Sequence, residues 1–367
     1  MKLESGSEIQ LRIDALASGG DGIGRHEGVV VFVPGAAPGD HLRCRIDQVR
    51  RNFARAHWTE ILEPGPGRRA PACRYADRCG GCDWLHLTED VQSGARRAFI
   101  RDALERLGGF RDVPEIESLP SPKSLSYRAL ARVSLGPEGI GFRARRSHRV
   151  VDIDECVVLT AAAQQALEQL RQNPPSGSRS DVVIRGFGND VAGLRASDSA
   201  FVQANQLLWE RWRQRVAGLC GSGSLLIELY AGIGFFTAGV ESNFEQVVAV
   251  ERSVAARDLR HNTRATVHHV SSELFAATGF AKLEPDVVLL NPPRIGCDPS
   301  VIDAIAASPT RRVVYVSCDA ATLARDLKRL GSDFELKEVV SVDALPQTSL
   351  TESIVRLDRI LDDDVDS

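Results

Sequence analysis

VVYVSCD, residues 313–319, is an apolar and β-branched run that ends at a cysteine, and a stretch with helical spacing follows it from Ala320 to Leu327. A buried strand that leads into a helix is the repeating unit of an open α/β sheet. The last residue of such a strand lies at the carboxyl edge of the sheet, where these folds bind their ligands. Most lone cysteines are small buried residues. This position, however, would let the thiol of Cys318 attack a ligand.

A glycine loop indicates the same fold. LLIEL (225–229) has the composition of a buried strand, and Tyr230-Ala231-Gly232-Ile233-Gly234 follows it. The two glycines allow a tight turn and a close approach to a ligand. A second strand (247–250) ends at Glu251, about twenty residues further on, where an acid accepts hydrogen bonds from ribose hydroxyls. The loop lacks the third glycine and the lysine of phosphate binders, so we predict a nucleoside ligand without phosphates, such as S-adenosylmethionine (SAM).

Two further strands carry polar residues at their ends. The strand 286–290 leads into Asn291-Pro292-Pro293-Arg294, whose prolines stiffen the loop and whose first residue should point into the ligand cleft. Glu352 precedes the strand 353–357. Taken alone, Glu352 has the sequence context of an exposed acid at the end of a strand.

These motifs together resemble one family, the RNA uracil-C5 methyltransferases. The F-x-Q-x-N motif at 201–205, the glycine loop, NPPR, VSC and the acid before the last strand occur in that family's order. The resemblance implies that Cys318 is the nucleophile and Glu352 the base. It also implies that SAM is bound by Gln203, Tyr230, Gly232, Phe235, Glu251 and Asn291. The family usually has Asp at 291, Asn at 235 and Asp at 228, so this chain differs there.

Four cysteines form a second motif. Cys73, Cys79 and Cys82 follow a C-x5-C-x2-C spacing, and Cys156 is a distant fourth cysteine. This spacing fits either a [4Fe–4S] cluster or a zinc ion. The family resemblance implies a [4Fe–4S] cluster. The other three cysteines, Cys44, Cys220 and Cys297, have no motif spacing, and we expect them to be structural.

The chain divides into three expected domains. Short strands at 9–13, 28–33, 41–46 and 54–62, separated by turns such as 19–24, predict an OB-like β-barrel over residues 1–62, which resembles a TRAM domain. Residues 63–195 would form a small strand-rich domain with the iron–sulfur site and a helix near 161–172. A helix at 88–107 could pack on the catalytic domain through Val91, Ala95, Phe99, Ala103 and Leu107. Residues 196–367 would form a Rossmann-like SAM-dependent methyltransferase domain that ends in an acidic tail (358–367).

Composition restricts the function further. Residues 1–150 contain 24 Lys and Arg against 19 Asp and Glu, whereas the remainder has 21 against 30, so the basic excess lies where RNA would bind. No apolar run is long enough to cross a membrane. We expect a cytoplasmic monomer that acts on RNA, with 23S rRNA favoured over tRNA.

Three other functions would each account for only part of the sequence. An N-methyltransferase would use an N-P-P motif, but it needs neither the cysteine nor Glu352, and it would have an aromatic residue where Arg294 stands. An RNA-binding iron–sulfur protein with a degenerate methyltransferase domain would bind RNA without transferring a methyl group. A radical-SAM methylthiotransferase is excluded because its C-x3-C-x2-C motif is absent.

Overall fold

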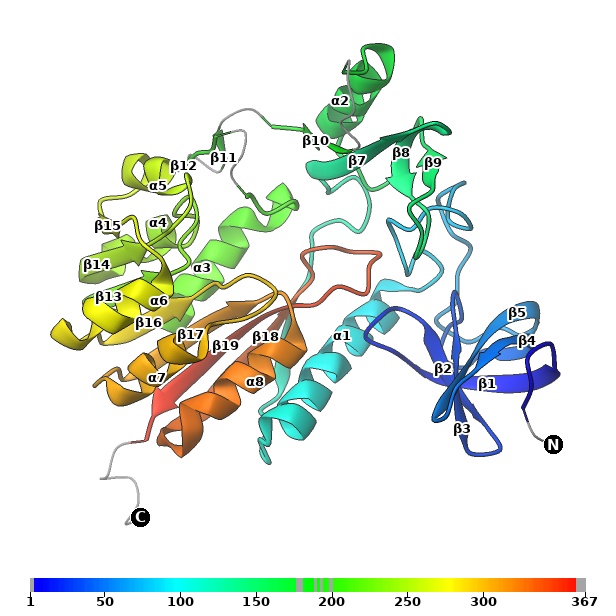
Figure 1. Ribbon diagram of the computed structural model, residues 1–367, viewed down its shortest axis with the longest axis horizontal. Helices are drawn as coiled ribbons and strands as arrows, with labels where there is room; N and C mark the ends of the chain where they lie inside the picture. Colours follow the sequence, from blue (N-terminus) through cyan, green and yellow to red (C-terminus); the bar gives the residue numbers. More distant parts are fainter. Residues whose placement is uncertain (1–2, 176–180, 188–189, 192–193, 198–200, 361–367) are drawn as a thin grey trace.

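The structure, a computed structural model, describes residues 3–175, 181–187, 190–191, 194–197 and 201–360. It contains a β-barrel, a small central sheet and a large α/β sheet, with the barrel and the large sheet on opposite sides of the molecule (Figure 1). Every helix among these residues is too short or too polar to span a lipid bilayer.

The first five strands close into a barrel in the order β1-β2-β3-β5-β4, which confirms the predicted OB-like fold. The strands are β1 (Glu8–Leu16), β2 (Gly22–His26), β3 (Val29–Val33), β4 (His41–Val49) and β5 (Phe53–Glu63). The prediction of a turn at residues 19–24 was partly wrong, because Gly22 and Gly24 lie in β2. A Cβ atom at Gly24 would lie 2.2 Å from the carbonyl oxygen of Arg12 in β1. Here glycine marks a close approach between strands.

The central sheet has the order β10-β7-β8-β9, and α2 (Ala161–Gln172) packs on it as predicted. Its strands are β7 (Leu130–Gly136), β8 (Gly139–Arg143), β9 (Val150–Asp152) and β10 (Asp181–Arg185). A two-stranded ribbon, β11 (Asp190–Val191) and β12 (Leu194–Arg195), follows in the chain. Thr160 caps α2, because its side chain accepts a hydrogen bond from the backbone N–H of Ala163.

The large sheet has eight strands in the order β15-β14-β13-β16-β17-β19-β18-β6. They are β6 (Ile116–Leu119), β13 (Gly223–Leu229), β14 (Phe244–Val250), β15 (Thr266–His268), β16 (Val287–Leu290), β17 (Arg312–Ser317), β18 (Phe334–Val342) and β19 (Glu352–Arg359). Strands β13 to β17 are mutually parallel, whereas β19 is antiparallel to β17. The amino end of β19 therefore lies at the same edge as the carboxyl ends of the parallel strands.

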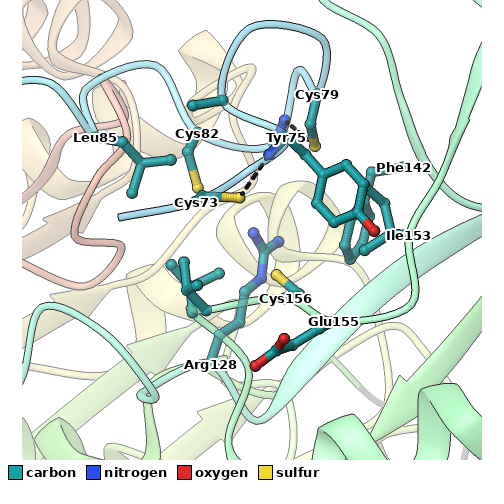
Figure 2. A pocket seen from close by; sticks show the side chains of 14 residues that line it. Cys73, Tyr75, Cys79, Cys82, Leu85, Arg128, Phe142, Ile153, Glu155 and Cys156 are labelled. Carbon is teal, nitrogen blue, oxygen red and sulfur yellow. Dashed lines mark hydrogen bonds between the residues drawn. The ribbon is translucent and has the colours of Figure 1, made fainter. Parts of the chain in front are cut away.

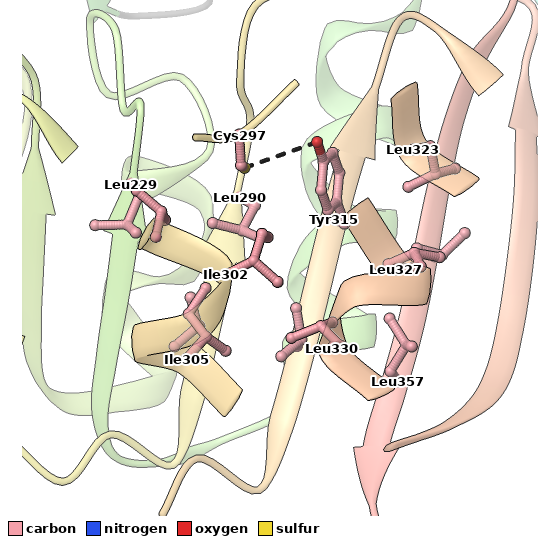
Figure 3. Close-up of a cluster of buried hydrophobic side chains, with 14 of the residues drawn as sticks. Leu229, Leu290, Cys297, Ile302, Ile305, Tyr315, Leu323, Leu327, Leu330 and Leu357 are labelled. Atoms are coloured by element: carbon pink, nitrogen blue, oxygen red, sulfur yellow. Dashed lines mark hydrogen bonds between the residues drawn. The ribbon is translucent and has the colours of Figure 1, made fainter. Parts of the chain in front are cut away.

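Helices cover both faces of this sheet. The α-helices are α1 (Glu89–Ala103), α3 (Trp209–Cys220), α4 (Thr237–Val240), α5 (Ala256–Asn262), α6 (Ser272–Thr278), α7 (Pro299–Ala307) and α8 (Ala320–Leu330). Short turns of other helix types are η1 (Leu104–Gly108), η2 (Gln206–Leu208), η3 (Glu241–Asn243), η4 (Phe280–Lys282) and η5 (Gly331–Asp333). Figure 3 shows leucines and isoleucines of α7 and α8 packed on Leu229, Leu290 and Leu357 of the sheet. Truncating one such leucine to alanine costs about 2–5 kcal/mol of stability.

Two expected boundaries differ from the structure. Strand β6 comes from the segment assigned to the central domain, yet it pairs with β18 of the large sheet. The packing of α1 on α8, by contrast, agrees with the expectation that the helix at 88–107 packs on the catalytic domain. The acidic tail was placed from residue 358, but Asp358 lies in β19 and accepts hydrogen bonds from Arg312 and Arg356. Residues 361–367 lie outside the described part of the chain.

The predicted buried face of the α1 region was also mostly wrong. The side chains buried on this helix are Gln92, Arg96, Ile100 and Ala103, whereas Leu107 is 50% exposed. Val91, Ala95 and Phe99 are only partly buried, and they pack against a smaller hydrophobic cluster. Periodicity of apolar residues could not identify a buried face that contains an arginine and a glutamine.

Candidate active site

A cavity of about 920 Å³ opens at the carboxyl edge of the large sheet. It is lined by residues from the ends of β13, β14, β16 and β17 and from the start of β19, which are the places from which sequence reasoning drew its candidates. The candidates that line it are Gln203, Tyr230, Gly232, Glu251, Asn291, Arg294, Cys318 and Glu352. The fold therefore brings together residues that are as much as 149 positions apart in the chain, from 203 to 352.

Cys318 lies between the last residue of β17 and the first turn of α8. Asp319 caps that helix, because its carboxylate accepts hydrogen bonds from the backbone N–H groups of Ala321 and Thr322. Burial and, to a smaller extent, the carboxylate of Glu352 raise the pKa of the Cys318 thiol to about 11, although the positive charge of Arg294 acts in the opposite direction. The resting side chain is therefore a thiol, and a nearby base or cation must help to form the thiolate nucleophile.

Glu352 is the first residue of β19 and is partly buried in the cavity wall. Burial raises its carboxyl pKa to about 8, and the guanidinium of Arg294 acts in the opposite direction. A carboxyl group with this pKa can exchange protons near neutral pH, as a general base requires. The structure therefore differs from the alternative of an exposed acid at the end of a strand.

The glycine loop is fixed by Glu251. Its carboxylate accepts hydrogen bonds from the backbone N–H of Gly232 at 2.9 Å and from that of Ser253 at 2.7 Å. Tyr230 has a φ of 62° and Gly232 a φ of 58°. A non-glycine residue with positive φ is strained, and such strain is concentrated at ligand sites. Apart from the two chain neighbours of Gly232, no heavy atom of the described residues lies within 4 Å of the position that a Cβ would occupy there, so the loop leaves space for a ligand.

Of two predicted cofactor contacts, Gln203 lies at the cavity and Phe235 does not. Gln203 lines the cavity, and its backbone carbonyl accepts a hydrogen bond from the indole of Trp209. Phe235 does not line the cavity. It is 8% exposed and packs edge-on against Trp209 and Phe236 in the core. The amide that the family usually has at this position is thus replaced here by an apolar core residue.

Glu228 has a role that sequence reasoning did not identify. It is fully buried in β13, and its carboxyl accepts a hydrogen bond from the hydroxyl of Thr237 at 2.5 Å. Burial raises its pKa to about 8, while the Thr237 hydrogen bond lowers it. The side chain is therefore protonated at neutral pH and adds no negative charge beside the glycine loop.

The four motif cysteines line a second, smaller and apolar cavity of about 30 Å³ (Figure 2). Burial raises the thiol pKa values of Cys79, Cys82 and Cys156. Arg128, which sequence reasoning missed, also lines the cavity, and its positive charge lowers the same three pKa values. In the described ranges, no three His, Cys, Asp or Glu side chains are already arranged around one metal position. Four thiols that share one cavity are a donor set that could hold either an iron–sulfur cluster or a zinc ion.

Comparisons with known proteins identify the family of the chain. Residues 2–59 match the model of the TRAM domain, and residues 189–360 match that of the tRNA (uracil-5-)-methyltransferase family. The chain is 32% identical to an uncharacterized RNA methyltransferase of Synechocystis sp., with 96% of each chain covered. It is 30% identical to the 23S rRNA (uracil(1939)-C(5))-methyltransferase RlmD of Pseudomonas putida, over 95% of this chain and 93% of that one.

A solved structure has the same fold. It is the tRNA (uracil-54, C5)-methyltransferase of Pyrococcus abyssi in complex with S-adenosyl-L-homocysteine. The TM-score is 0.74 at 23% identity, and the match covers 95% of this chain and all of the other.

Proposed function

Because the chain belongs to the RNA (uracil-5-)-methyltransferase family, we propose that it methylates C5 of one uridine in 23S ribosomal RNA. It is a SAM-dependent enzyme of RNA modification, and its TRAM domain is an RNA-binding module. The observation that carries the proposal is that Cys318 and Glu352 line one cavity together with the glycine loop. The ribosomal substrate is favoured by 30% identity to the Pseudomonas putida enzyme over nearly the whole chain.

The chemistry begins with the cysteine. Uracil C5 is a weak nucleophile, so the Cys318 thiolate adds to C6 and forms an S–C6 bond, which makes C5 electron-rich. Arg294 lines the same cavity and lowers the pKa of Cys318, so it favours the thiolate. SAM, when bound, would supply the electrophilic methyl group: C5 forms its bond to the methyl carbon as the S–CH₃ bond breaks, and S-adenosylhomocysteine is the leaving group.

The base then completes the reaction. The carboxylate of Glu352 takes the proton from C5, the electron pair of that C–H bond restores the C5–C6 double bond, and the S–C6 bond breaks to release Cys318 as thiolate. Each step uses a group that lines the cavity. The uracil must leave its base stack to enter this cavity, so the target is a flipped or single-stranded nucleotide.

The residues proposed to hold SAM are those of the glycine-loop side of the cavity. Glu251 lies at the carboxyl end of β14, where a carboxylate accepts hydrogen bonds from ribose hydroxyls. Tyr230 and Gly232 would contact the nucleoside of SAM. Gln203 and Asn291 would contact SAM on the side of the cavity that it shares with the uracil. Phe235 is not included, because it lies in the core.

We also propose that Cys73, Cys79, Cys82 and Cys156 hold a [4Fe–4S] cluster. The support is the single cavity that the four share and the positive charge of Arg128 beside it. Four thiolate ligands leave no open position on such a cluster, so its role here would be to fix the central domain. Free thiols persist in a reducing compartment, which favours a cytoplasmic location.

Mass spectrometry of RNA nucleosides tests the substrate. In a strain that lacks the gene, 23S rRNA should lose one 5-methyluridine, and the purified protein should restore it. Loss of 5-methyluridine from tRNA alone would instead favour a tRNA enzyme, the function named for the Pyrococcus abyssi protein. No loss from either RNA would contradict the proposal.

A further inference from the structure

The segment that leads into Glu352 is held by side chains from outside the large sheet. Residues 343–351, here termed the base loop, join β18 to β19. In Figure 1 this loop extends from the sheet toward one end of α1. Many of its contacts come from α1 and from the segment that contains the motif cysteines, and Ser124 and Tyr127 add two more hydrogen bonds.

Gln347 is the most connected residue of the base loop. It is fully buried and has a φ of 68°. Its side-chain oxygen accepts hydrogen bonds from Gln92 and from Arg69, each at 3.0 Å. Its backbone N–H donates to the Gln92 side chain at 2.9 Å, and its carbonyl accepts from the N–H groups of Asp83 and Trp84, both at 3.0 Å.

Two more contacts hold the same loop. The buried guanidinium of Arg96 donates to the carbonyl of Thr348 at 2.9 Å, and another of its nitrogens lies 2.9 Å from the carboxylate of Asp343. The carboxylate of Asp83 accepts hydrogen bonds from the N–H and the hydroxyl of Ser349, at 3.2 and 2.9 Å. Asp83 directly follows Cys82, so the cysteine segment is joined to the base loop at Gln347 and at Ser349.

These polar contacts attach α1 to the base loop, which in most helices is done by the packing of an apolar face. Burying glutamine and arginine costs free energy unless every polar group is paired, and an apolar face of equal volume stabilises at least as well. A polar network does, however, select one geometry of the groups that it joins, and here most of the buried polar groups are paired, although the Nε of Arg96 has no hydrogen-bond partner among the described residues. Gln347 also keeps a positive φ, which costs on the order of 1 kcal/mol and is found where function requires a fixed backbone.

We propose that Gln347 is a positioning residue that holds the base loop so that the carboxylate of Glu352 meets the C5 proton, and that it couples this geometry to the cysteine segment. The inference rests on the proposed function, since it concerns the same base. In this proposal, the buried face of α1 and the contact of Asp83 with Ser349 serve the last step of the reaction, the removal of the C5 proton. The first steps, which use Cys318 at the end of β17, do not depend on the base loop.

Gln347→Gly is the sharpest test. Glycine adopts a positive φ without strain and keeps the backbone N–H and carbonyl contacts. The loss is confined to the side chain, namely its hydrogen bonds to Gln92, Arg69 and Ser124 and the volume that it fills. We expect the covalent protein–RNA adduct to form within about twofold of the wild-type rate, and we expect its release to slow by about tenfold, equivalent to about 1.4 kcal/mol. Denaturing gels with labelled SAM would then show a methylated adduct that accumulates, while the KM for SAM stays unchanged.

Matched variants separate positioning from general damage. Gln214→Ala removes an exposed glutamine of α3 whose side chain donates a hydrogen bond to Glu210, and it should release product like the wild type. Ser349→Ala removes one contact to Asp83 and should slow release in the same direction by a smaller factor. Gln347→Asn, which tolerates positive φ and keeps an amide, should recover part of the release rate.

Two results would overturn the inference: release at the wild-type rate by Gln347→Gly, or an equal loss in adduct formation and release, which indicates a merely structural role. A wild-type protein that transfers no methyl group to any RNA would instead contradict the proposed function.

Discussion

Ser317 and Ser353 are direct partners in the antiparallel pairing of β17 with β19, and the hydroxyl of Ser353 donates to the carbonyl of Ser317 at 3.4 Å. Cys318 is the next residue after Ser317, and Glu352 is the residue before Ser353. In an antiparallel pair these two positions are opposite each other at the sheet edge. The register of two strands thus brings the proposed nucleophile and the proposed base to one cavity.

Glu352→Gln should stop the last step and spare the earlier ones. The amide keeps the size of the side chain but cannot take a proton. The methylated adduct through Cys318 should therefore accumulate on denaturing gels. In the wild type, adduct release should rise with pH and level off above about 8, because the base acts in its ionised form and burial raises its pKa to about 8. The variant should show no such rise, and release of methylated RNA at the wild-type rate would mean that another group is the base.

Glu228→Gln should alter stability in a pH-dependent way. The folded-state pKa of Glu228 is raised from 4.5 to about 8, so the folded protein keeps a proton that the unfolded chain loses. The wild type should therefore lose stability as pH rises from about 4.5 to 8. The melting temperature of the variant, measured by calorimetry, should exceed that of the wild type increasingly across this range. Glu245→Gln, at an exposed position of β14, should show no such trend.

The four motif cysteines should bind iron. Protein purified without oxygen should be brown and contain about four irons per chain, and Cys156→Ser should lose most of that iron. Cys220→Ser changes a cysteine buried in a different core cluster and should retain the iron. One zinc per chain with no visible absorbance would contradict the cluster.

Asn291→Asp should strengthen SAM binding. Residue 291 lines the cavity, and a carboxylate there would attract the positive sulfonium of the cofactor. The KM for SAM should fall by a few-fold, as measured by initial rates at fixed RNA concentration, whereas Asn291→Ala should raise it. An unchanged KM in both variants would place Asn291 outside the SAM site.

The sequence was sufficient to predict the parts that depend on local pattern. The buried strands at 225–229, 247–250 and 313–318, each with a polar residue near its end, predicted the sheet and most residues of the cavity. Pairing between distant strands could not be predicted in the same way. Strand β6 joins the large sheet through β18, which had not been identified as a strand, and Gly22 and Gly24 were interpreted as turn residues although they allow two strands to approach closely.

The polar network behind the base loop was missed for a physical reason. Gln92, Arg96 and Gln347 are residue types that usually face water, so neither composition nor periodicity identifies them as buried. Their burial depends on contacts between distant segments, because Gln92 bonds Gln347, 255 positions away in the chain, and Arg96 pairs with Asp343. Phe235 shows the opposite case. Its place after the glycine loop predicts a cofactor contact, but the side chain packs against the aromatic rings of Trp209 and Phe236 in the core.

Release of tritium from C5 tests the central claim most directly. RNA transcribed with [5-³H]uridine is incubated with the purified protein and SAM that carries a ¹⁴C-labelled methyl group, and both labels are counted. Substitution at C5 through Cys318 predicts one tritium released for each methyl group transferred, with neither event in a Cys318→Ala variant that still binds SAM. Methyl transfer without tritium release, or normal release by the alanine variant, would contradict it.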